Sequence, residues 1–86
     1  MLETGGLDKL TRQLEEASRV FKSLGGELAR VTVVPGDQAS VQAAIQQVEM
    51  AIDQKAAPYR GNDLVESMVE QLKKRYRDEL IKRGKP

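Results

Sequence analysis

The chain has 86 residues, with 14 Lys or Arg, 13 Asp or Glu and neither Cys nor His, so its formal net charge at pH 7 is +1. An apolar share of 40% is too high for a disordered chain, and the near-neutral balance gives no global attraction to nucleic acids or membranes. Without Cys and His, the chain has no disulfide, no usual zinc ligand set, no thiol nucleophile and no histidine base. With no apolar run near the ~20 residues that span a bilayer, we expect one small cytoplasmic domain without a cofactor.

The first expected helix covers residues 7–24. Its apolar residues are alternately three and four positions apart: Leu7, Leu10, Leu14, Ala17, Phe21 and Leu24. This 3.5-residue period is the seam of a helix that packs nearly parallel or antiparallel to another helix. The glycine pair at residues 25–26 predicts the end of this helix.

An extended segment is expected over residues 27–34, because four consecutive residues near its end, 31–34, are all β-branched. A lone strand would leave its backbone N–H and C=O groups unpaired. Two alternatives remain open for this segment. It pairs with a strand of another copy or a partner, or it is an extended crossover that packs on the helices.

The second helix is expected over residues 38–56, with Asp37 as its N-cap. Its apolar residues step by four, three and four positions: Val41, Ile45, Val48 and Ile52. Few charges lie on this helix, which is typical of a helix packed between others. Pro58 restricts the residue before it and predicts the helix end.

The third helix is expected over residues 63–83, where Asp63 and Glu66 predict a capping box, and residues 84–86 are expected to fray. The sequence therefore predicts a mainly α fold in the order helix, extended segment, helix, helix. The second and third helices would form an antiparallel hairpin, with the first helix packed across them.

The second half of the third helix is basic. Residues 73–86 hold seven Lys or Arg and two acidic residues, so their local net charge is +5. The candidate phosphate contacts are Lys73, Lys74, Arg75, Arg77, Lys82 and Arg83. Cations at a helix C-terminus also complement the helix dipole, which is the simpler interpretation. Helix-turn-helix recognition is disfavoured, because Asp63 and Glu66 at the start of this helix would repel DNA.

Catalytic and metal sites find little support in the residues. Ser18 and Lys22 are one helical turn apart, but the expected outcome for this pair is a solvated helix face. Glu49 and Asp53, also one turn apart, supply too few oxygens for calcium, which takes ~6–8. We therefore predict that the protein is not an enzyme and holds no metal.

The stretches 24–28 and 37–47, followed by the helix start at Asn62, resemble small uncharacterised proteins encoded among phage and prophage genes of bacteria. The resemblance implies a genomic setting. It implies no activity and no functional residue.

The leading functional hypothesis is a non-enzymatic structural or protein-interaction module that binds a protein partner or a second copy of itself. The residues assigned to self-association are Val31 and Val33 of the extended segment and Leu10 and Leu14 of the first helix. The alternative is a non-specific nucleic-acid-binding protein that uses the basic third helix. No membrane partner is expected.

Overall fold

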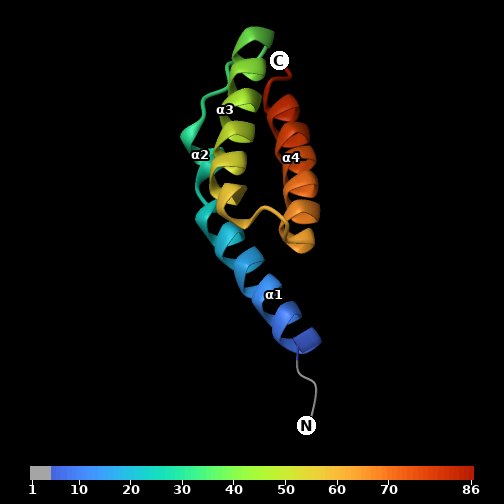
Figure 1. The fold of residues 1–86 in the computed structure, drawn as a ribbon. Coiled ribbons are helices and arrows are strands. Elements are labelled where there is room, and N and C mark those ends of the chain that lie inside the picture. The colour runs from blue at the N-terminus through green and yellow to red at the C-terminus, as the bar shows by residue number, and fades with distance from the viewer. Residues whose placement is uncertain (1–4) are drawn as a thin grey trace.

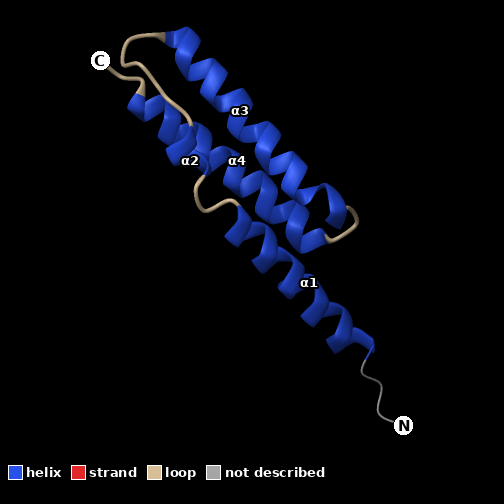
Figure 2. Cartoon of the chain, turned by 90° about the vertical axis from the view of Figure 1, so that its left-hand side faces the viewer, coloured by secondary structure: helices blue, strands red, loops and turns tan. Residues whose placement is uncertain are grey.

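The computed structural model describes residues 5–86, which form helices and connecting loops (Figure 2). In chain order the elements are α1 (Gly5–Ser23), α2 (Glu27–Arg30), α3 (Gln38–Ala56), the 3-10 turn η1 (Ala57–Tyr59) and α4 (Asp63–Arg83). The mainly α class and the three long helices are therefore confirmed.

Helices α3 and α4 lie side by side as an antiparallel hairpin (Figure 1). Helix α3 begins where Asp37 Oδ1 accepts hydrogen bonds from the N–H groups of Ala39 and Ser40, at 3.0 and 3.3 Å. Helix α4 is capped by Asn62, one residue earlier than the expected capping box. Asn62 precedes the first helical residue, so its side chain reaches the free N–H groups, whereas Asp63 already lies inside the helix.

The hydrophobic core lies between the hairpin and the part of the chain that runs from the end of α1 to α3. Its buried apolar residues are Val20, Leu24, Val31, Val41, Ala44, Ile45, Val48, Ile52, Val65, Leu72 and Leu80. All four periodic residues of α3 belong to this core. Aliphatic side chains alone fill its buried centre, and Tyr59 and Tyr76 pack partly buried against it.

The extended segment expected over residues 27–34 is confirmed only for residues 31–34, and the pairing of this segment as a strand is not supported. Residues 27–30 form α2, and residues 31–34 run as a single extended segment that pairs with no strand in the described part of the chain. Val31 is buried in the core, and the N–H of Val34 donates to Ser40 Oγ at 2.9 Å. Side-chain burial and a hydroxyl partner thus replace strand pairing, as in the crossover alternative.

The C-terminal end of α4 lies against the start of α3. The N–H of Gly36 donates to the carbonyl of Gly84 at 2.8 Å, so the first of the residues expected to fray is tied to the loop before α3. Gly36 has a φ of 83°, in the left-handed region that favours glycine. A Cβ added to Gly84 would overlap Val41 Cγ2, because the two helices approach closely there.

Helix α1 packs on the hairpin with its second half only. Its first half extends past the hairpin turn (Figure 1), which gives the molecule an elongated shape with principal extents of 63 × 17 × 17 Å. The expectation that the first helix packs across the hairpin therefore holds for about half of its length.

Candidate functional site

Helix α1 has two apolar faces. Val20 and Leu24, each 1% exposed, are buried against the hairpin, and Ala17 packs beside them. Ala17, Val20 and Leu24 are spaced three and four residues apart, so a second helical face was readable in the sequence. This face was not predicted, because Val20 does not belong to the 3.5-residue seam.

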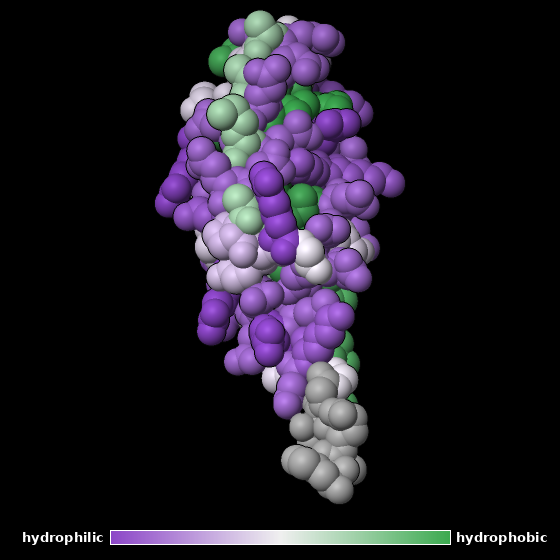
Figure 3. Space-filling view, in the orientation of Figure 1, coloured by the Kyte–Doolittle hydropathy of each residue, from purple (hydrophilic) through white to green (hydrophobic). Residues whose placement is uncertain are grey.

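The remaining seam residues form a row on the outside, which we name the outer stripe. It consists of Leu7, Leu10, Leu14 and Phe21, which are 68%, 46%, 55% and 56% exposed. At 100° of rotation per residue, this stripe lies about 90° around the helix from the buried face. In Figure 3, green apolar surface follows one edge of α1 where the helix extends past the hairpin.

Asn62 fixes α1 to the hairpin turn. Its Oδ1 accepts from the N–H groups of Leu64 and Val65, and its Nδ2 donates to the carbonyl of Gln13 at 3.2 Å and to Glu16 Oε1 at 2.8 Å. Asn62 is 5% exposed. This one amide caps α4 and holds the middle of α1, and so it determines where the free half of α1 begins.

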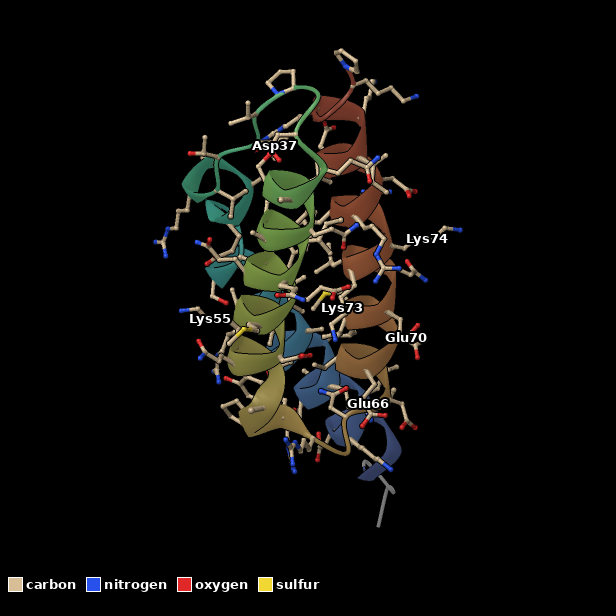
Figure 4. All side chains as sticks on the ribbon, turned by 90° about the horizontal axis from the view of Figure 1, so that it is seen from above. Asp37, Lys55, Glu66, Glu70, Lys73 and Lys74 are labelled. Carbon is tan, nitrogen blue, oxygen red and sulfur yellow. The ribbon has the colours of Figure 1, made fainter. Side chains whose placement is uncertain are left out.

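Two acidic residues of α3 are neutralised by basic residues of α4. Lys73 Nζ lies 2.7 Å from Asp53 Oδ1, and Arg77 Nη2 lies 2.7 Å from Glu49 Oε2. The acidic pair that was weighed as a cation site is therefore part of the contact between the two helices. Figure 4 shows Lys73 between α3 and α4, whereas Lys74 points away from the hairpin.

The six candidate phosphate-binding residues do not form one surface. Besides the two pairs to α3, the Arg83 guanidinium donates to the carbonyl of Leu28 at 3.1 Å and lies 3.6 Å from Glu79. Lys74, Arg75 and Lys82 are exposed and have no ion pair within residues 5–86. By helical rotation Asp78 falls between them, which reduces their combined positive potential.

The four residues assigned to self-association are likewise separated. Val31 is buried, and Val33 packs against the core, so neither presents a strand edge. Leu10 and Leu14 belong to the outer stripe and remain exposed. Self-association through Leu10 and Leu14 stays a prediction, whereas Val31 and Val33 have no strand partner in the described part of the chain.

Hollows lie at both ends of the hairpin. One of about 430 Å³ at the hairpin turn is lined by the charged residues Asp53, Arg60, Glu66 and Glu70. A hollow of about 510 Å³ lies between the start of α3 and the end of α4, and Lys85 is its one ionisable lining residue. Within residues 5–86, no three acidic side chains come together in an arrangement that would hold a metal. None of the described helices is both long and apolar enough to cross a bilayer.

A protein-family model described as YuaX matches residues 4–85, a range that includes all the helices from α1 to α4. The chain belongs to the YuaX family. An uncharacterised YuaX protein of Escherichia coli strain K12 is 32% identical over 76 residues, which cover 88% of this chain and 78% of that protein. No solved structure is significantly similar to this family member. The phage or prophage setting stays a prediction.

Proposed function

We propose that this YuaX-family protein is a non-enzymatic interaction module that presents the outer stripe of α1 to a protein partner. The observation that carries the proposal is the exposure of four large apolar side chains in one row on a helix that is anchored at its other end. Covering a large apolar side chain contributes up to ~1.5–3 kcal/mol, and the chain itself leaves much of this unused.

The size of the stripe supports the proposal. An aromatic side chain buries ~150–250 Å², so four half-exposed large side chains leave roughly 400 Å² of apolar surface in water. The largest apolar patch of a monomeric protein is typically ~300–600 Å² and often functional. A patch in this range on a projecting helix suits the helix-in-groove mode of recognition.

The prediction that the chain is not an enzyme fits the same picture. Several of its carboxylates serve in helix caps and ion pairs: Asp37 caps α3, while Glu49 and Asp53 pair with α4. An assembly role would suit a phage or prophage gene, and neighbouring capsid, tail or packaging genes would support that setting.

Site-specific photocrosslinking in cells tests the proposal. A photoreactive phenylalanine analogue at Leu10 should form protein adducts of discrete mass after illumination. The matched control is the same analogue at Met50, which is also a large exposed apolar residue but lies on the outward side of α3. A further Leu14→Glu change should abolish the adducts at position 10. Equal labelling at positions 10 and 50, or no labelling at position 10 in a folded protein, would contradict the proposal.

Nucleic-acid binding is the second candidate, and the three unpaired cations of α4 favour it. Lys74, Arg75 and Lys82 would contact phosphates without sequence preference. The test is fluorescence anisotropy with mixed-sequence DNA and RNA at ~50 mM and ~200 mM salt, because phosphate contacts weaken steeply across this range. Binding at low salt that a triple alanine variant of these residues removes would support it, and no binding at ~50 mM would exclude it.

A further inference from the structure

We infer that the partner of the outer stripe is a second copy of this chain, with two α1 helices packed antiparallel about a two-fold axis at Leu14. This inference rests on the proposed function and specifies its partner. The antiparallel arrangement follows from three features of α1: the spacing of the stripe, the charges beside it and the free half of the helix.

Three of the four stripe residues are symmetric about Leu14. Leu7 and Phe21 each lie seven residues, or two helical turns, from Leu14. An antiparallel two-fold axis at Leu14 therefore places Leu14 on Leu14 of the second copy and Leu7 on Phe21 of the second copy. Leu10 then faces the small residues Ala17 and Ser18, which leave room for it. A surface that matches itself in this way is what an isologous dimer requires.

The edge of the stripe carries residues that suit the same arrangement. Thr11 and Ser18 lie directly beside the stripe, on the side away from the buried face of α1. Both are uncharged, so the centre of the contact buries no charge there. Further out on that edge, Asp8 lies near one end and Lys22 near the other. An antiparallel pair brings these unlike charges together at both ends, because the same edge of each helix then faces that of the other. Glu15 also lies on this edge, but about 100° around the helix from Leu14, so it flanks the contact and does not face its centre.

The shape of the molecule leaves room for the second copy. The hairpin lies beside the second half of α1, and most of the first half extends past the hairpin turn (Figure 1). An antiparallel axis at Leu14 places the free half of each helix next to the anchored half of the other. The two hairpins then lie on opposite halves of the pair, and their turns meet near the axis.

The buried area predicts a weak dimer. Eight stripe residues would cover roughly 800 Å², and the flanking polar residues would raise the total toward the ~1,200 Å² at which specific interfaces begin. We therefore expect a dissociation constant in the micromolar range rather than the nanomolar range. A membrane surface fits less well, because Glu15 and Glu16 interrupt the polar face, which in surface-bound helices is rich in Lys and Arg.

Cysteine crosslinking tests the arrangement directly, since the chain has no native cysteine. Leu14→Cys should give a disulfide-linked dimer on mild oxidation at ~100 μM, because two residues on the axis come within the ~7 Å that a disulfide allows between Cα atoms. Leu7→Cys alone should give no linked dimer. The two copies of residue 7 would lie about 21 Å apart, measured along the direction of the helices. A mixture of Leu7→Cys and a size-tagged Phe21→Cys should crosslink to each other. Met50→Cys, on the outside of α3, measures random collision.

Sedimentation supplies the second measurement. The wild-type protein should shift from about 9.6 kDa toward twice that mass between ~5 and ~300 μM, and Leu14→Glu should weaken the association at least tenfold. Met50→Glu, which makes the same kind of change elsewhere, should not. Efficient crosslinking of Leu7→Cys to itself would overturn the antiparallel axis.

The failure of this inference differs from the failure of the proposed function. One outcome is that the wild-type protein stays monomeric at ~300 μM while position 10 still crosslinks to another protein in cells. This outcome would overturn the inference of a second copy and leave the proposed function in place. A monomer that instead binds anionic lipid vesicles, with no protein adduct at position 10, overturns both.

Discussion

Helices α1 and α3 have the same apolar spacing but different surroundings. In α3 the residues at steps of four and three, Val41 to Ile52, are at most 9% exposed, whereas the outer stripe of α1 is 46–68% exposed. The difference lies in what the chain places beside each helix. Helix α3 has 19 residues beside the 21 of α4, while α1 meets the hairpin along its second half only. Apolar periodicity therefore shows that a helix has a side to cover, and the rest of the chain decides whether that side is covered.

The largest expected effect compares one substitution in the two regions. Leu80 is 0% exposed in the hairpin and Leu7 is 68% exposed on α1. Leu80→Ala should lower the free energy of unfolding by ~2–5 kcal/mol, through lost burial and the cavity left behind. Leu7→Ala should change it by less than ~0.5 kcal/mol. Urea unfolding followed by circular dichroism at ~5 μM protein measures both, and equal losses would mean that the free half of α1 is packed in solution.

The next effect breaks the link between the two regions at Asn62. Asn62→Ala removes the α4 cap and the two hydrogen bonds to α1, and should cost ~2–3 kcal/mol. Asn62→Ser keeps a capping oxygen but loses the donor to α1, so it should cost ~1 kcal/mol. Both variants should speed amide hydrogen exchange in the middle of α1. Equal losses of stability in the two variants would show that the capping oxygen contributes nothing, and an Asn62→Ser variant as stable as the wild type would show the same of the contact with α1.

A smaller effect concerns the close approach of α3 and α4 at Gly84. Gly84→Ala should cost ~1–3 kcal/mol, because the added methyl overlaps the stiff, branched side chain of Val41. Gly26→Ala is the matched control. It meets no atom within 4 Å, and its φ of −107° is open to alanine. Thermal melting of both variants checks this, and a Gly84 variant as stable as the control would show that Val41 moves away without strain.

The hairpin was predictable from sequence because its signals are local. Steps of three and four, Asp37 as a cap and Pro58 as a stop predicted α3 over residues 38–56, the observed bounds. The conformation of residues 27–34 was not predictable in this way. β-branched residues favour an extended chain, but they do not supply a partner strand. Here Val31 gains burial in the core, and Ser40 supplies the hydrogen bonds of Val34.

The candidate site was predictable in part, for a similar reason. Leu10 and Leu14 were named from their period, but the same period grouped them with the buried Leu24. The basic residues of α4 were identified by charge, yet the pairing of Lys73 and Arg77 with α3 depends on the register of two helices. Contacts between residues far apart in sequence decide both outcomes, and composition and spacing do not contain them.

The smallest expected effect concerns those ion pairs, which join the hairpin at its surface. Lys73 and Asp53 are 30% and 62% exposed at their side chains, so the pair should contribute only ~0.2–1 kcal/mol. A double-mutant cycle with Lys73→Met and Asp53→Asn measures the coupling by urea unfolding. The matched control is a cycle with Lys74→Met and Asp53→Asn. Lys74 points away from α3, so this cycle should show no coupling.

Salt sharpens this last test. Exposed charges are screened beyond ~3 Å at 1 M salt, so the Lys73–Asp53 coupling should fall toward zero there, while the cost of Leu80→Ala should persist. That contrast would show that apolar burial holds the hairpin together and that the ion pairs mainly fix which faces of α3 and α4 meet. A coupling above ~1 kcal/mol that survives high salt would contradict this view, because it would require a pair shielded from water.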